Sequence, residues 1–180
     1  MRLHGYFRSS AAFRVRIALN LKGVSVEHAF RHLRRNEQIA PDYLALNPQG
    51  QVPTFETDSG DVLVQSLAII QWLDETFPDP PLMPGNSLRR ARIMAFALSI
   101  AADIHPVQNL KVLNRLRSMG HDEKTVMEWA AWINRDGLAA SEKLIAEEAG
   151  PFAFGAAPTL ADLCLVPQMY NARRFGVDVT

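Results

Sequence analysis

The sequence predicts an α/β domain followed by an all-helical domain, and two observations support that prediction. Up to residue 77, short runs of alternating apolar and polar residues are interspersed with segments of helical spacing and turn signals, in the order βαβαββα. A proline-rich stretch follows, after which the pattern is nearly pure helix. We therefore expect an α/β domain over residues 1–78, a linker over 79–87 and a helical domain over 88–180.

The α/β domain is expected to begin with a strand over 3–7 and a largely buried helix that ends at Lys22-Gly23. Apolar residues at helical spacing fill most of the circumference of this helix. Ser9 and Ser10 stand just before it, where the N-terminus of a helix favours an anion. The simpler alternative is that one of these serines serves only as an N-cap.

The rest of the α/β domain is predicted from turn residues and alternation. Ser66 is expected to be the N-cap of its last helix. The expected elements are a strand over 24–30, a polar loop over 31–35, a weak helix over 37–46 interrupted by Pro41, strands over 52–55 and 62–64 joined by a hairpin turn, and a helix that ends at residue 77.

The helical domain is expected to contain three main helices. The first is a long amphipathic helix over 93–107 with a kink near Pro106. The second runs over 126–144 with the same apolar spacing. The third begins at a capping box formed by Thr159 and Asp162.

The composition limits the functions open to the chain. Its 19 basic and 19 acidic residues balance, which argues against nucleic acid as the main partner. No apolar run reaches membrane-spanning length and the start lacks a signal-peptide pattern, so we expect no membrane partner and a cytoplasmic location. No metal-ligand spacing or phosphate-binding glycine loop is present, and the lone Cys164 is expected to be buried and inert.

Five stretches carry motifs that are weak singly and specific when taken together and in order. They are Arg8-Ser9-Ser10 with residues 14–19, and the stretches 47–53, 65–70, 163–168 and 171–175. With these motifs the whole chain resembles the zeta class of the cytosolic glutathione transferases, whose members are maleylacetoacetate isomerases, with bacterial maleylpyruvate isomerases as close relatives. The resemblance implies a thioredoxin-like first domain, a glutathione-transferase helical domain, glutathione as cofactor and a homodimer.

Two features depart from the family pattern. Ala11 stands where the family usually has a cysteine, so no thiol at that position contributes to catalysis. The family also runs roughly thirty residues beyond the Arg174-Phe175 motif, a segment of ordinary size within a domain. The present sequence stops at Thr180. The resemblance therefore implies either a short protein or a last helix that is absent from this sequence.

The resemblance also assigns glutathione-binding residues. Ser9, with Ser10 as a neighbouring donor, would hydrogen-bond the glutathione sulfur and favour thiolate over thiol. Val52 would pair its backbone with the cysteinyl part beside a cis bond to Pro53, whereas an ordinary edge-strand proline is the alternative. The remaining cofactor-binding residues are Gln65 and Ser66 for the γ-glutamyl carboxylate, Gln38 for the glycyl end, and Gln108 and Asn109 as polar walls.

For the second substrate the resemblance implies a small dicarboxylate held by cations. Arg8 and Arg174 match the family positions, and guanidinium groups suit bidentate carboxylate binding. A solvated charge at a helix end is the alternative for Arg174. We count Arg8 with Ser9 and Ser10 as catalytic, because it would also stabilise the enolate charge that develops during the reaction.

The implied reaction is the glutathione-dependent cis–trans isomerisation of maleylacetoacetate, a step of tyrosine and other aromatic amino-acid breakdown, by thiolate addition, bond rotation and elimination. One alternative is the isomerisation of maleylpyruvate from gentisate breakdown. A second is a glutathione transferase or dehalogenase acting on α-halo acids. A more distant alternative is a glutathione-binding module without turnover, which the missing cysteine and short C-terminus favour.

Overall fold

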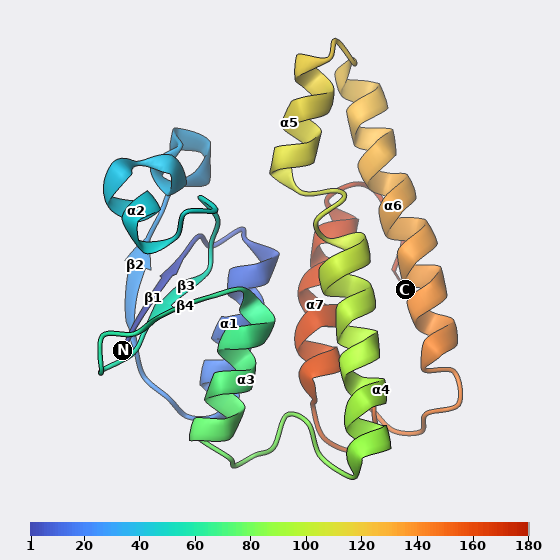
Figure 1. Cartoon of the computed structure of the whole chain (residues 1–180). Helices are drawn as coiled ribbons and strands as arrows, with labels where there is room; N and C mark the ends of the chain where they lie inside the picture. The colour runs from blue at the N-terminus through green and yellow to red at the C-terminus, as the bar shows by residue number, and fades with distance from the viewer. Residues whose placement is uncertain (180) are drawn as a thin grey trace. The chain divides into compact units, whose positions relative to one another are not determined.

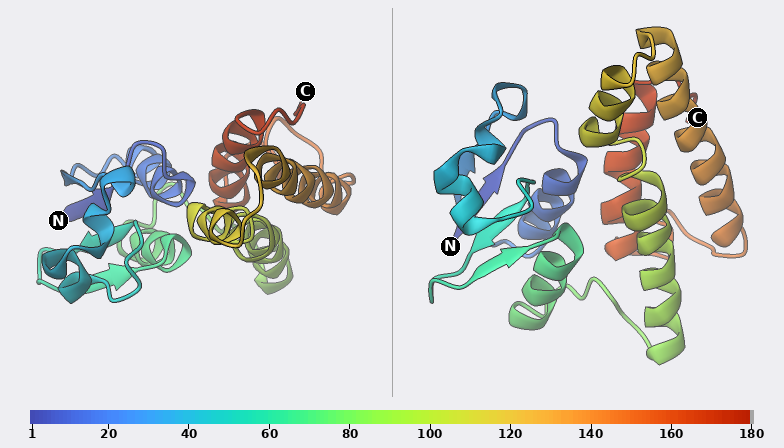
Figure 2. Two further views of the ribbon diagram at one scale, coloured as in Figure 1. Left: turned by 90° about the horizontal axis from the view of Figure 1, so that it is seen from above. Right: turned by 45° about the horizontal axis from the view of Figure 1, so that its top comes forward.

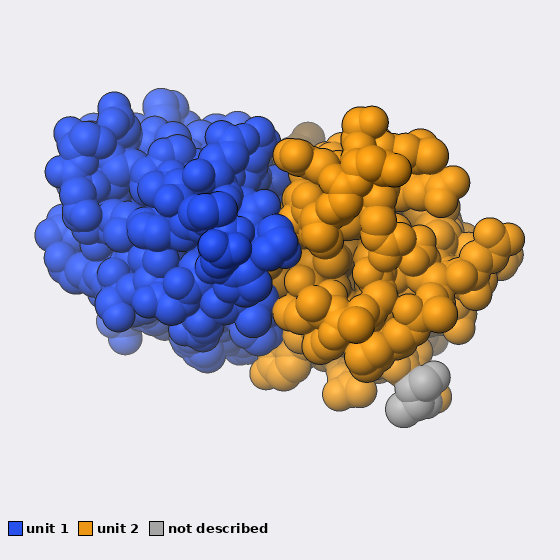
Figure 3. Space-filling model, turned by 90° about the horizontal axis from the view of Figure 1, so that it is seen from below, with its two compact units in different colours: residues 1–81 blue, residues 82–180 orange. Residues whose placement is uncertain are grey.

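The structure, a computed structural model, describes residues 1–179, which form two compact units. The first unit comprises residues 1–81, and the second begins at Leu82 (Figure 3). Among the described helices, none is both long enough and apolar enough to cross a membrane.

The first unit has its strands and α-helices in the expected order βαβαββα, with two short 3₁₀-helices before the second α-helix. The elements are β1 (Arg2–Gly5), α1 (Ser10–Leu21), β2 (Glu27–Phe30), η1 (Leu33–Arg35), η2 (Glu37–Ile39), α2 (Pro41–Leu46), β3 (Thr54–Glu56), β4 (Val62–Val64) and α3 (Ser66–Thr76). The strands form a sheet in the order β2-β1-β3-β4, in which β1 runs parallel to β2 and antiparallel to β3, and β3 runs antiparallel to β4. The α1 and α3 helices pack against each other beside this sheet (Figure 1). This confirms the predicted thioredoxin-like class.

The core of the first unit is formed where α3 meets the sheet. Leu3 of β1 lies opposite Phe55 of β3 in the ladder, and both side chains are buried. The Phe55 ring lies 5.6 Å from the ring of Trp72, measured between centroids, so this strand faces α3. Ile69 and Leu73 recur four residues apart on α3 and are also buried, as the helical spacing predicts.

Several local predictions in this unit need correction. The N-cap of α3 is Gln65, and the expected cap Ser66 is instead the first helical residue. Pro41 does not interrupt a helix but begins α2, because the first position of a helix needs no N–H donor. The expected loop over 31–35 includes η1. The first two strands are shorter than expected, since β1 and β2 pair only over four residues.

The second unit is helical, as expected. Its elements are α4 (Ser87–Leu98), the π-helix η3 (Ser99–Ile104), α5 (Leu110–Ser118), α6 (Glu123–Leu144) and α7 (Leu160–Arg173). The α4 helix packs against α7, and α6 packs against η3, α5 and α7 (Figures 1 and 2). The α6 helix begins and ends within a few residues of the predicted positions, and so does the start of α7.

The prediction of one long helix over 93–107 with a kink near Pro106 is wrong at its C-terminal end. The α4 helix continues only through η3, whose last bond joins the His105 N–H to the Ile100 carbonyl. The helix therefore ends before Pro106 rather than kinking there, because proline lacks a donor and its ring clashes with the preceding turn. The α5 helix beyond this break was not predicted. Only Leu113 of this helix is buried, although Leu110, Leu113 and Leu116 recur at helical spacing along it.

The α7 helix begins at the predicted capping box. The Asp162 carboxylate accepts hydrogen bonds from the backbone N–H of Thr159 at 2.8 Å and from that of Ala153, also at 2.8 Å. Asp162 is buried, so these charge-assisted bonds compensate for its lost hydration. Because it also binds Ala153, the box fastens the preceding loop to the helix.

Gly137 lies on α6 where that helix meets η3. A Cβ atom at this position would stand 2.4 Å from Cγ1 of the buried Ile104. We expect Gly137→Ala to lower the free energy of unfolding by roughly 1–2 kcal/mol, because overpacking costs more than alanine recovers in helix propensity. Denaturant unfolding followed by circular dichroism measures the change.

Two further variants isolate the packing effect. In a background with Ile104→Ala, the loss from Gly137→Ala should shrink, because the truncated side chain leaves room for the new methyl group. Ala139→Gly, at an exposed position of the same helix, reports helix propensity alone. A Gly137→Ala protein that is as stable as the wild type would contradict this account.

Candidate functional site

Four segments that contain predicted site residues lie at the same edge of the first unit's sheet, the edge formed by the ends of its strands. His4 of β1 pairs with Thr54 of β3, and Thr54 pairs with Val64 of β4. Gly5 at the end of β1 lies opposite Phe30 at the end of β2. Because β1, β2 and β4 run in one direction and β3 in the other, this edge carries residues 6–10, 31–38, 47–53 and 65–66. Segments that lie far apart in the chain are thus brought together by strand register.

Ser9 caps the N-terminus of α1, at the end of the turn after β1. Its backbone N–H donates to the Tyr6 carbonyl at 2.9 Å, and its Oγ accepts from the Ala12 N–H at 3.2 Å. A serine hydroxyl carries one hydrogen and two lone pairs, so a cap that uses a lone pair leaves the hydrogen available for donation. The N-cap and thiolate-donor interpretations of Ser9 are therefore compatible. Ser10 is the first helical residue and is buried.

Arg8 precedes this cap and is partly exposed. Within residues 1–179, no carboxylate forms an ion pair with its guanidinium group. A cation that is not already engaged can bind an incoming carboxylate without first breaking an internal pair. The geometry thus leaves Arg8 suited to the role that the resemblance implies.

The N-terminus of α3 is formed by Gln65 and Ser66. Gln65 has φ 70° and ψ 121°, a backbone conformation that residues with a side chain rarely adopt and that costs on the order of 1–3 kcal/mol. Its carbonyl accepts from the Ile69 N–H at 3.0 Å, and its side-chain amide donates to Gln49 at 2.8 Å. The first N–H groups of a helix lack partners within the helix and attract an anion. This end of α3 accordingly has the properties of a carboxylate site.

The peptide bond between Val52 and Pro53 is cis, as the resemblance implies. Val52 lies outside the strands, and within the described part of the chain neither its N–H nor its carbonyl has a hydrogen-bond partner. An unpaired donor and acceptor on one residue can pair with an extended peptide ligand as an additional strand would. A second cis bond, between Asp79 and Pro80, was not predicted.

A buried polar cluster holds the loop around Val52, and the sequence did not reveal it. The Tyr43 hydroxyl donates to the Gln51 carbonyl at 2.6 Å, and the Asn47 side-chain amide donates to the same oxygen at 2.8 Å. Both groups also contact the Thr54 hydroxyl, at 2.8 and 3.2 Å. Burial raises the pKa of the Tyr43 phenol above its usual range, so the hydroxyl stays protonated as a donor. Tyr43 lies within the weak helix expected over 37–46, and nothing in that pattern indicated a buried hydrogen-bonded cluster.

Gln38 lies on η2, next to the same loop. Gly50, with φ 60°, approaches this short helix so closely that a Cβ atom there would stand 3.2 Å from the Gln38 carbonyl and 3.0 Å from Cγ2 of Ile39. Among the described residues, Oε1 of Gln38 has no hydrogen-bond partner although it is shielded from solvent. It is therefore an acceptor placed beside the Val52 loop.

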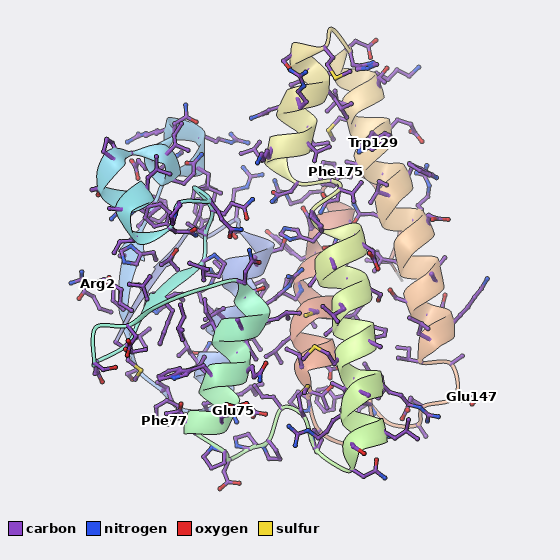
Figure 4. The ribbon with its side chains drawn as sticks, in the orientation of Figure 1. Arg2, Glu75, Phe77, Trp129, Glu147 and Phe175 are labelled. Carbon is purple, nitrogen blue, oxygen red and sulfur yellow. The ribbon has the colours of Figure 1, made fainter. Side chains whose placement is uncertain are left out.

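The other predicted residues belong to the second unit. Gln108 is 2% exposed, and its Nε2 has no hydrogen-bond partner within residues 1–179. Asn109 caps α5, with Oδ1 accepting from the Leu110 N–H at 2.8 Å. The turn that carries both is anchored by the Trp129 indole, which donates to the Val107 carbonyl at 3.1 Å. Trp129 packs in a cluster with Phe175 (Figure 4). Arg174 is the exposed C-cap of α7.

The surroundings of the lone cysteine can be compared with the expectation. Cys164 is buried, as expected. In the described part of the chain no group of three or more His, Cys, Asp or Glu side chains is arranged to hold a metal ion.

Comparisons with known proteins identify the family to which the chain is similar. The model of the glutathione S-transferase N-terminal domain matches residues 3–81. A maleylacetoacetate isomerase from Pseudomonas aeruginosa is 48% identical over 180 residues, which cover 98% of this chain and 84% of that protein. The holo structure of a bacterial zeta-class maleylpyruvate isomerase is 43% identical with a TM-score of 0.96, covering 100% of this chain and 86% of the other. A maleylacetoacetate isomerase from Methylobacterium extorquens AM1, solved with malonate and glutathione, is 39% identical with a TM-score of 0.95 and the same coverage.

We expect Tyr43→Phe to weaken glutathione binding several-fold and to lower the free energy of unfolding by about 1 kcal/mol. The variant removes one of the two side-chain donors to the Gln51 carbonyl, so the loop that carries Val52 is held less firmly. Calorimetric titration and denaturant unfolding measure the two effects. Tyr170→Phe, at an exposed position of α7, is the matched control. Unchanged affinity in Tyr43→Phe would show that the cluster does not position the loop.

Proposed function

Because the chain belongs to the zeta class of the glutathione transferases, we propose that it is a glutathione-dependent cis–trans isomerase of maleylacetoacetate. The observation that supports this most is the convergence of four segments at one edge of the sheet. Together they present two helix N-termini, an unpaired backbone donor and acceptor at Val52, and the arginine Arg8. That combination suits a thiol peptide with carboxylates at its ends.

In this proposal Ser9 activates the thiol of glutathione. Its hydroxyl donates to the sulfur, and the N-terminal amides of α1 add positive potential, with Ser10 as a second donor. Both effects stabilise thiolate relative to thiol and so lower the pKa of the bound cofactor. The γ-glutamyl carboxylate binds at Gln65 and Ser66, and Gln38 contacts the glycyl end. Gln108 and Asn109 remain proposed polar walls.

The chemical step leaves glutathione unchanged overall. The thiolate sulfur forms a bond to one carbon of the cis double bond, and the electron pair of that double bond moves toward the adjacent carbonyl oxygen as an enolate. The remaining carbon–carbon single bond then rotates. When the enolate returns its electron pair, the carbon–sulfur bond breaks and the trans product leaves. Arg8 and Arg174 are the proposed cations for the substrate carboxylates and the developing enolate charge.

A dicarboxylate substrate is supported by a solved relative that holds malonate together with glutathione. Maleylpyruvate is the second candidate substrate, because a maleylpyruvate isomerase matches the whole chain with a TM-score of 0.96. Both compounds present a cis double bond between carboxylate-bearing arms, so the same thiolate and arginines would serve either.

The deciding experiment follows the glutathione-dependent loss of absorbance of each substrate while total thiol is measured in the same cuvette. The proposal expects rapid loss at constant thiol, and the faster substrate identifies the natural one. Thiol consumed in step with product would indicate a transferase or dehalogenase instead. Glutathione binding with no turnover of either substrate would indicate a binding module and would contradict the proposed isomerase.

We expect Ser9→Ala to lower kcat/KM on the order of 10²-fold, the usual effect of losing one donor to a developing or stabilised anion. The bound thiol should also titrate at higher pH, which ultraviolet absorbance of the thiolate detects. Ser9→Gly separates this effect from stability, because glycine preserves most of an N-cap that alanine loses. Equal activity loss in both variants, with lower stability only in Ser9→Ala, is the expected pattern. An unchanged rate would remove Ser9 from the mechanism.

We also propose that the protein is a cytoplasmic homodimer, on the basis of the family alone. Light scattering in solution should then give twice the monomer mass of 20.1 kDa. A measured mass of one chain at micromolar concentration would contradict the dimer.

A further inference from the structure

The first unit contains an arginine side chain that is almost fully enclosed. Arg14, on α1, is 2% exposed, the largest side chain among those that are fully buried. Its Nη1 donates to the hydroxyl of Ser66 at 3.3 Å. A guanidinium group remains charged in proteins, so the packing of α1 against α3 encloses a permanent cation beside the first residue of α3.

The direction of this hydrogen bond determines what the Ser66 hydroxyl can do. Arginine has only donors, so the contact with Arg14 uses a lone pair of Ser66 Oγ. The single hydrogen of the hydroxyl is then available to donate to another group. Ser66 itself is 5% exposed and stands at the N-terminus of α3, where the helix amides already favour an anion.

We propose that Arg14 is a positioning residue for the γ-glutamyl carboxylate of glutathione, an inference that rests on the proposed function. Arg14 acts by holding Ser66 as a hydrogen-bond donor directed at that carboxylate. It also adds positive potential behind the amides of α3. With an ordinary O–H···O distance of about 2.7 Å, the carboxylate oxygen would lie within about 6 Å of Nη1, close enough for a substantial attraction in a partly buried site.

A second arginine on the same helix provides a matched control. Arg16 donates to the Phe7 carbonyl at 3.4 Å and lies over the Phe13 ring, away from Ser66. It is only partly enclosed, and burial lowers the pKa of its guanidinium. Arg16→Gln therefore removes the same charge from the same helix without removing a donor to Ser66.

The test compares two ligands by calorimetric titration. One is glutathione, and the other is 4-aminobutanoyl-cysteinyl-glycine, which lacks only the carboxylate of the γ-glutamyl group. Arg14→Gln should weaken glutathione binding about tenfold, comparable to the loss of a hydrogen bond to a charged group, and should leave the affinity for the analogue within about twofold. Arg16→Gln should change neither affinity by more than about twofold.

A double-mutant cycle tests whether Arg14 acts through Ser66. Ser66→Ala alone should weaken glutathione binding, and adding Arg14→Gln should cost less than it does in the wild type, because the shared hydroxyl is already gone. Arg14→Lys preserves the charge and should recover part of the preference for glutathione over the analogue, even if Arg14→Gln fails to fold. Thermal unfolding of each variant monitors the fold separately from the binding preference.

Four outcomes overturn the inference. Equal losses for both ligands in Arg14→Gln, or in Arg14→Lys if only that variant folds, would show a merely structural role. Fully additive losses in the cycle would show that Arg14 does not act through Ser66. Wild-type protein that binds neither ligand would refute the proposed function and this inference with it. Wild-type binding that is indifferent to the γ-glutamyl carboxylate would refute only the inference.

Discussion

The register of the four-stranded sheet is the constraint on which the candidate site depends. The ladder that aligns His4, Thr54 and Val64 makes β1, β3 and β4 end together, and parallel pairing adds the end of β2. A slip by one residue would turn the buried side chains of a strand toward solvent, so burial of Leu3 and Phe55 opposes it. The same apolar contacts that stabilise the fold therefore keep the four segments with candidate site residues at one edge.

Behind that edge, buried polar side chains support the groups that would meet the ligand. Tyr43 and Asn47 hold the Gln51 carbonyl, and Arg14 holds the Ser66 hydroxyl. Burying polar groups costs free energy unless they are paired, so each of these contacts restricts a neighbouring backbone or hydroxyl to one arrangement. Gln65 adds a backbone conformation that is unfavourable on its own, and such strain is concentrated at functional sites in proteins.

The second unit orders its polar residues through helix ends and close helix packing. Asp162 fastens the start of α7 to the preceding loop, and Trp129 fastens the turn after η3 to α6. Gly137 allows η3 to approach α6 more closely than a side chain would permit. These contacts determine where the turn with Gln108 and Asn109 leaves the helix. The π-helix itself is a local widening of the kind often found next to functional positions.

The sequence by itself determined the class of both parts and the order of the strands and main helices, because alternation, caps and prolines are local properties. The candidate roles of Ser9, Val52, Gln65 and Ser66 came from the family resemblance that the ordered motifs carry. Only the tertiary structure decided that Gln65 rather than Ser66 caps α3, that the first long helix of the second unit ends before Pro106, and that α5 follows it. It alone showed the support from Tyr43 and Arg14, because both residues sit at ordinary helical spacing. Their partners lie 8 and 52 residues away, and only the packed fold brings such atoms within hydrogen-bond distance.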